Sequence, residues 1–211
     1  QRSLQSFNEI SQRLREPLSH RDWIDLYQKL SHYDVELSGD EGARQIFQDQ
    51  FKEANRTFGS FIEDTYADWI ARTDDSPDEN RPVLSHEVVP EFVIPELEDD
   101  PVVFFVIDCM RYDQWREFAD LLQPHFAIEE DFYYSILPTA TPYSRNAIFS
   151  GMLPDALIDR FPRVWEKAEE NEHSRNQYEE AFLHDLLDRK GHGDLNIRYD
   201  KLITTEDGRG F

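Results

Sequence analysis

Two residues stand at positions where this chain could act on a phosphate group. Asp108 directly follows an unbroken apolar run, 102–107, and Thr141 precedes a proline in the Thr-Ala-Thr-Pro turn 139–142. A carboxylate is a ligand for divalent cations, and a hydroxyl beside a cation can become an alkoxide that attacks phosphorus. A hydroxyl at a helix N-terminus also faces free amides and a positive dipole end, where phosphate binds. The two residues are therefore candidates for a metal ligand and a nucleophile.

Each candidate also has an ordinary structural explanation. An Asp at a helix start accepts hydrogen bonds from the first free amides, and Thr followed by Pro is a common N-cap and N1 pair. Arg111 could neutralise Asp108, and one carboxylate alone does not make a metal site. Thr139 is a rival hydroxyl, expected to contact the backbone. Arg145 lies one helical turn after Thr141 and could hold a phosphate oxygen, but a surface salt bridge is its commoner role.

The elements that must hold Asp108 and Thr141 are predicted by the periodicity of the C-terminal half. A continuous apolar run such as 102–107 is typical of a strand buried on both faces of a parallel sheet. Further strands are expected at 126–134 and 195–199, and helices at 112–122, 143–150, 161–169 and 177–189. Ligands of such sheets bind at the carboxyl ends of the strands, so the two residues should converge there. The predicted fold class is α/β: an N-terminal helical bundle, then a truncated α/β/α layered domain with a mainly parallel sheet.

The preceding part of the chain is predicted to be helical. Apolar residues recur at helical spacing over 4–14, 22–30 and 47–69, which predicts a small antiparallel bundle within residues 1–73. The aromatic stripe of the third helix packs on the first two helices or on a second copy of the chain, and the internal core is favoured. Residues 74–100 are acidic and then proline-rich, which indicates a linker that docks on the next domain, 101–211.

The composition excludes several classes of protein. Asp and Glu number 44 against 22 Lys and Arg, a net charge of −22, and such a field repels duplex DNA. No apolar run reaches the ~18 residues that a membrane span needs. Cys109 is the single cysteine, so no internal disulfide can form, which fits a reducing cytoplasm.

Two segments carry a resemblance to a known family. VVFFVIDCMRYDQW and YYSILPTATPYSRNAIFSGMLP resemble the PglZ domain, a branch of the alkaline phosphatase superfamily. The helix ending FGSFIEDTYADWI and the linker RPVLSH are similar to those of PorX-type response regulators, which join a receiver, a helical and a PglZ domain and are linked to type IX secretion. The resemblance covers most of residues 40–211. It implies that Asp108 binds zinc and that Thr141 is the nucleophile and contacts the metal.

The resemblance also implies a function and partners. The function is metal-dependent phosphodiester hydrolysis, with oligonucleotides or cyclic nucleotides as substrates, in a cytoplasmic two-component regulator. The implied partners are a sensor kinase and a sigma factor, and a homodimer is expected. An alternative hypothesis is a regulatory interaction or dimerisation module that has no activity in this chain.

The chain departs from the family pattern in two respects. The residues before Leu4 contain no acidic phosphoacceptor pocket or βα repeat, so we expect no receiver domain within this sequence. The superfamily completes its metal site with an Asp-His pair and a further His, and none of the seven histidines here follows an Asp: His20, His32, His86, His125, His173, His184 and His192. We therefore expect the chain to be a fragment that binds zinc weakly or not at all.

Overall fold

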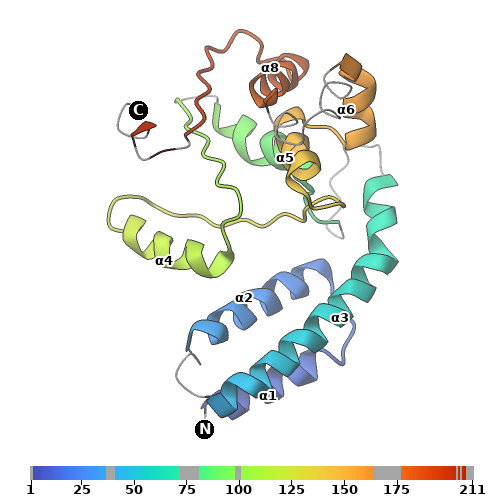
Figure 1. Ribbon diagram of the computed structural model, residues 1–211, viewed down its shortest axis with the longest axis vertical. Coiled ribbons are helices and arrows are strands. Elements are labelled where there is room, and N and C mark those ends of the chain that lie inside the picture. Colours follow the sequence, from blue (N-terminus) through green and yellow to red (C-terminus); the bar gives the residue numbers. More distant parts are fainter. Residues whose placement is uncertain are drawn as a thin grey trace. The chain divides into compact units, whose positions relative to one another are not determined.

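The chain folds into two compact units in a computed structural model (Figure 1). The first unit comprises Gln1–Pro82 and Val106–Phe132, and the second comprises Val83–Phe105 and Tyr133–Phe211. The structure describes residues 2–36, 41–71, 81–97, 101–163, 177–202, 204, 206 and 207. None of the helices in these ranges is long and apolar enough to cross a membrane.

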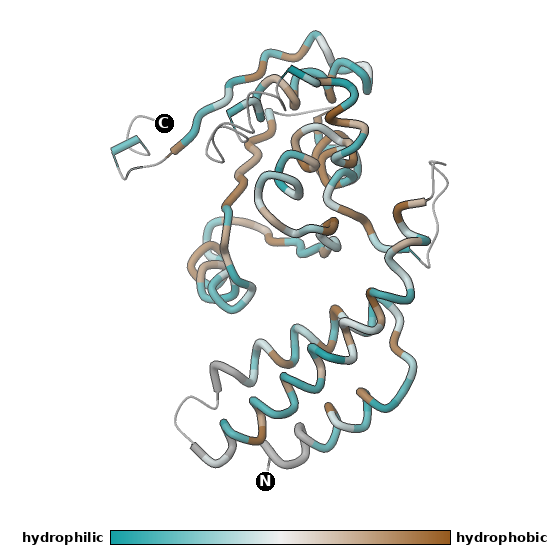
Figure 2. The backbone as a smooth tube through the Cα atoms, turned by 45° about the vertical axis from the view of Figure 1, so that its right-hand side comes forward, coloured by the Kyte–Doolittle hydropathy of each residue, from teal (hydrophilic) through white to brown (hydrophobic). Residues whose placement is uncertain are grey.

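The first unit contains the three helices that the periodicity predicts. They are α1 (Arg2–Arg13), α2 (His20–Glu36) and α3 (Glu41–Ala71). Both α1 and α2 pack on α3, and Figure 2 shows hydrophobic residues recurring along all three helices. Their core consists of seven buried side chains, Ile10, Leu14, Trp23, Leu26, Leu30, Phe47 and Ala54. The aromatic stripe of α3 continues this core, because Phe51, Phe58 and Phe61 pack against it.

A reciprocal capping box explains why α2 begins at His20. The Ser19 hydroxyl oxygen accepts from the Asp22 backbone N–H at 3.2 Å, and the Asp22 carboxylate accepts from the Ser19 N–H at 2.9 Å and hydroxyl at 2.6 Å. Arg13 of α1 donates to the same carboxylate at 2.6 Å. These hydrogen bonds, led by that from the Ser19 side chain, lower the pKa of Asp22 to about 2. One acidic side chain thus caps α2 and joins it to α1.

The helix α4 (Tyr112–Leu122) packs on α2 within the same unit. Gln28 donates to the Tyr112 hydroxyl at 3.0 Å, and the rings of Tyr27 and Tyr112 lie 6.0 Å apart. The Glu130 carboxylate accepts hydrogen bonds from the Tyr112 hydroxyl and the Trp115 indole. These contacts fix the start of the helix that follows Asp108.

The second unit is built around a short helix, α5 (Thr141–Ser150), whose last five residues are all buried. It packs on α8 (Glu179–Arg189) and on the turn η2 (Ser85–Glu87), and less extensively on α6 (Pro154–Arg160). The turns η3 (Val89–Val93) and η4 (Ile94–Leu97) follow η2. Among the described residues of this unit, one buried apolar cluster contains Val88, Val89, Ile148 and Leu186, and another contains Phe149, Leu157 and Phe182.

The predicted α/β fold with a parallel sheet is wrong for the part of the chain that the structure describes. None of the three expected strands, 102–107, 126–134 and 195–199, forms there. Strand-type pairing is confined, among these residues, to one isolated parallel bridge between Leu84 and Tyr134. The described helices α4, α5 and α8 do form where the periodicity predicts them, and the helix expected at 161–169 lies mostly outside the described residues.

The apolar run 102–107 shows why the strand prediction failed. A strand buried on both faces needs neighbouring strands for its backbone and helices for its side chains. In the described chain the run has no such ladder, and Val103, Phe105 and Ile107 are 61%, 65% and 55% exposed. Phe104 alone of the run packs against the core clusters, with its ring 6.2 Å from that of Phe149. The apolar, β-prone composition of 102–107 predicted burial, but a strand also needs a partner strand, which composition does not reveal.

Candidate functional site

Thr141 is the first residue of α5. The N-cap is Ala140, with extended backbone angles, and Pro142 is the second helical residue, so the expected Thr N-cap and Pro N1 assignment was wrong by one position. The Ser144 hydroxyl donates to the carbonyls of Thr139 and Ala140 at 3.1 and 3.3 Å and closes the turn before the helix. Thr141 is half-buried and Thr139 is exposed. Thr141 therefore lies at the N-terminal end of a helix whose entry is held by hydrogen bonds.

Arg145 lies one turn further along α5 and forms an ion pair. Its Nε donates to Oε1 of Glu179, the first residue of α8, and the Glu179 side chain is only 2% exposed. The Tyr199 hydroxyl donates to the other carboxylate oxygen at 2.7 Å. Burial, and then this hydrogen bond to Glu179, raise the pKa of Tyr199. Arg145 thus forms the predicted salt bridge, although its partner Glu179 is buried and the pair is not a surface one. A contact of Arg145 with phosphate stays a prediction.

Glu179 and Tyr199 were not singled out by the sequence. Glu179 begins a helix, where an acidic residue is ordinary, and Tyr199 lies 20 residues further on in a segment that was expected to be a strand. No local pattern connects either residue with Arg145, which lies 34 residues before Glu179. Only the folded chain brings the three side chains together.

Asp108 lies in a turn of the first unit and is exposed. It is not the N-cap of α4, because that position belongs to Arg111, whose backbone N–H donates to Gln114 at 3.0 Å. Cys109 follows with a φ of 62°, and its sulfur lies 3.7 Å from an Asp108 carboxylate oxygen. Arg111 pairs with Asp113, and this hydrogen bond lowers the pKa of Asp113. The capping explanation for Asp108 is therefore wrong, and its role as a ligand stays a prediction.

The described residues do not assemble a zinc site by themselves. Zinc needs three or four protein ligands. Among the described residues no group of three or more His, Cys, Asp or Glu side chains is placed to hold a metal ion. Asp108 belongs to the first unit and Thr141 to the second, so their convergence also stays a prediction.

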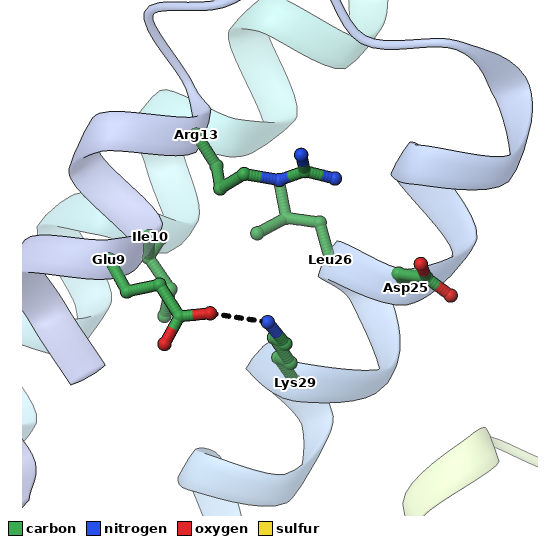
Figure 3. Close-up of a pocket in the computed structure, with 6 residues that line it drawn as sticks. All are labelled: Glu9, Ile10, Arg13, Asp25, Leu26 and Lys29. Carbon is green, nitrogen blue, oxygen red and sulfur yellow. Dashed lines mark hydrogen bonds and ion pairs between the residues drawn. The ribbon is translucent and has the colours of Figure 1, made fainter.

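A small pocket lies elsewhere, between α1 and α2 (Figure 3). Its lining residues are Glu9, Ile10, Arg13, Asp25, Leu26 and Lys29. Figure 3 shows Lys29 pointing to Glu9, and this ion pair lowers the pKa of Glu9. The volume of about 40 Å³ has room for water molecules but is far below the ~300 Å³ of a small-molecule site. The pocket is therefore a feature of helix packing in the first unit.

Comparison with known families agrees with the motifs around Asp108 and Thr141. Residues 88–210 match the model described as the BREX system PglZ alkaline phosphatase-like domain, which defines a phosphoesterase-like class of protein. Because this match covers more than half of the sequence, the chain belongs to the PglZ family. Residues 1–70 match the PorX response regulator linker domain, and the two matches confirm the resemblance to a PorX-type regulator with a PglZ part. No curated protein matches the chain.

The two matches define the function in outline. A response regulator linker is joined to a phosphoesterase-like module, and a linker of this kind implies signalling partners in general. Alkaline phosphatase-like domains are generally metal dependent. Thr141 and Arg145 lie within the PglZ match, and so does Asp108.

Proposed function

We propose that this chain is part of a two-component response regulator whose PglZ domain hydrolyses phosphodiester bonds. The proposed substrates are oligonucleotides or cyclic nucleotides, and the proposed role is regulation of type IX secretion from the cytoplasm. The observation that carries the proposal is the position of Thr141, at the N-terminal end of a helix whose C-terminal half is buried, inside the segment that matches the PglZ family.

The chemistry proposed for Thr141 is nucleophilic. Its hydroxyl oxygen gives up its proton to solvent and attacks phosphorus in line, forming a phosphothreonine ester while the bond to the leaving oxygen breaks and that oxygen takes up a proton. Water then hydrolyses the phosphothreonine ester, which releases the phosphate product and restores the Thr141 hydroxyl. The positive end of the α5 dipole favours the negative charge of the phosphate at this place. Asp108 is proposed as one zinc ligand within a larger set, because the described residues do not supply the others.

The domain roles belong to the same proposal. Residues 1–73 form a signalling and dimerisation bundle and 74–100 a docking linker, and residues 101–211 belong to the PglZ domain. The proposed partners are a sensor kinase and a sigma factor. These roles are supported by the linker-domain match over residues 1–70.

Hydrolysis of bis(p-nitrophenyl) phosphate by the full-length protein tests the catalytic proposal. Thr141→Ala should lower kcat by about 10³-fold or more, because removal of a nucleophile has effects of this size. Thr139→Ala is the matched control, since Thr139 is exposed and precedes the helix, and it should keep activity. Asp108→Ala should raise the zinc concentration needed for half-maximal activity. Full activity of Thr141→Ala would show that the nucleophile is wrongly assigned.

A second candidate function is a regulatory interaction module without hydrolysis, favoured by the linker-domain match. Light scattering over a range of protein concentrations separates the two. A full-length protein that has no hydrolytic activity, and whose dimerisation depends on the state of a receiver domain, would support the interaction module. A strictly monomeric protein in every state would count against it.

A further inference from the structure

The helix that carries Thr141 is held by α8 at its middle and at its C-terminal end. At the middle, Arg145 pairs with Glu179, and at the end Arg189 donates to the carbonyl oxygen of Ser150. Between these points, Ile148 packs with Leu186 in a buried cluster. Side chains of α8 therefore help to set the orientation of α5 in its unit, together with the packing of α5 on η2 and α6.

The ion pair between Arg145 and Glu179 is more buried than an ordinary surface ion pair. The Arg145 side chain is 17% exposed and that of Glu179 is 2% exposed. Both carboxylate oxygens of Glu179 are used, one by Arg145 and the other by Tyr199. An Arg145 that swung out to a phosphate would leave a buried carboxylate without its cation, and such states are strongly disfavoured.

The spacing along α5 connects this ion pair with the nucleophile. Residues four apart lie on the same face of a helix, so Arg145 anchors the face on which Thr141 lies. Holding Arg145 therefore restrains rotation of α5 about its own axis. Such a rotation would move the hydroxyl of Thr141, which lies in the first turn of α5.

We propose that Glu179 is a positioning residue which, with Tyr199, holds Arg145 in the α5–α8 contact, so that Arg145 orients Thr141 and does not contact the phosphate. The inference rests on the proposed phosphodiesterase function. It assigns to Arg145 a role opposite to that of a phosphate-binding arginine at the same position.

A double-mutant cycle on the full-length protein separates the two roles. The variants are Arg145→Met, Glu179→Gln and the double variant, and the readouts are Tm, kcat and KM for bis(p-nitrophenyl) phosphate. Arg145→Met leaves the buried carboxylate without its cation and should lower Tm and reduce kcat by roughly tenfold or more, since small misplacements of reacting groups cost this much. Its KM should change little. Glu179→Gln in the double variant replaces the unpaired carboxyl group with a neutral amide that keeps an acceptor oxygen for Tyr199.

The double variant decides the question. Recovery of most of the Tm and kcat lost in Arg145→Met is the expected result, because an orienting contact tolerates a neutral replacement. A double variant that recovers Tm but keeps low activity and a raised KM would overturn the inference, since Arg145 would then be needed by the substrate. Additive Tm changes, with no recovery, would also overturn it.

Two controls keep the outcomes distinct. Arg198→Met removes an exposed ion pair with Asp200 in the same unit and should leave Tm and kcat unchanged. A wild-type protein without hydrolytic activity would refute the proposed function and with it the orienting role. The Tm cycle would in that case report on the Arg145–Glu179 contact alone.

Discussion

Gly151→Ala should destabilise the second unit through two separable effects. Gly151 ends α5 in the left-handed region with a φ of 62°, and its N–H donates to the Ala147 carbonyl at 2.9 Å. A residue with a Cβ costs about 1–2 kcal/mol in this conformation. A Cβ at this position would also lie 2.5 Å from Cδ1 and 3.2 Å from Cδ2 of Leu186, which is fully buried. Overpacking of this kind costs about 1–3 kcal/mol.

The sum predicts a loss of roughly 3 kcal/mol in the free energy of unfolding, measured by urea denaturation. Gly191→Ala is the matched control, because Gly191 also has a positive φ, 87°, but no atom lies within 4 Å of a Cβ added there. It should lose only the backbone contribution, about 1 kcal/mol. Equal losses in the two variants would refute the steric argument, and no loss in either would refute the backbone argument.

Three further predictions concern stability, each measured by urea or thermal unfolding. The pKa of Asp22 falls from 3.8 to about 2 on folding, so its contribution to the free energy of unfolding is present above about pH 4 and is lost as the pH falls toward 2. Asp22→Asn should therefore flatten the pH dependence of stability between about pH 4 and 2. An unchanged slope would contradict the capping box. Phe104→Ala should cost about 2 kcal/mol and Phe105→Ala less than about 0.5 kcal/mol, because Phe104 contacts the core and Phe105 is 65% exposed; similar costs would contradict the observed placement of 102–107. Gly59→Ala, with nothing within 4 Å of the added Cβ in the middle of α3, should raise stability by up to ~1 kcal/mol, and a loss would mean that the helix is not regular there.

The family could be recognised from the sequence because its motifs are continuous. The segments around Asp108 and Thr141 carry the resemblance, and the family match over 88–210 confirms it. The residue types and their spacing do not by themselves assign Asp108 as a metal ligand or Thr141 as a nucleophile, because either residue could have been a helix cap. The structure removes that explanation by giving the cap positions to Arg111 and Ala140.

The helices were predictable from the sequence because their signals are local. The spacing of apolar residues determines which face of a helix is buried, and it predicted 112–122 with the bounds that α4 has. The capping box of Ser19 and Asp22 lies within four residues of chain. Signals of this range need no knowledge of the rest of the fold.

Pairing between distant segments was decided by the tertiary structure. A strand forms only where another segment of backbone offers hydrogen bonds in register. The apolar run 102–107 indicates a preference for burial, but it contains no information on which segment would pair with it. The contact of Arg145 with Glu179 joins residues 34 apart, and nothing near either residue encodes it. The sequence by itself thus determined the helices and the family motifs. Whether the apolar segments pair into a sheet, and how the Thr141 helix is anchored, depend on contacts between distant residues, which form only in the folded chain.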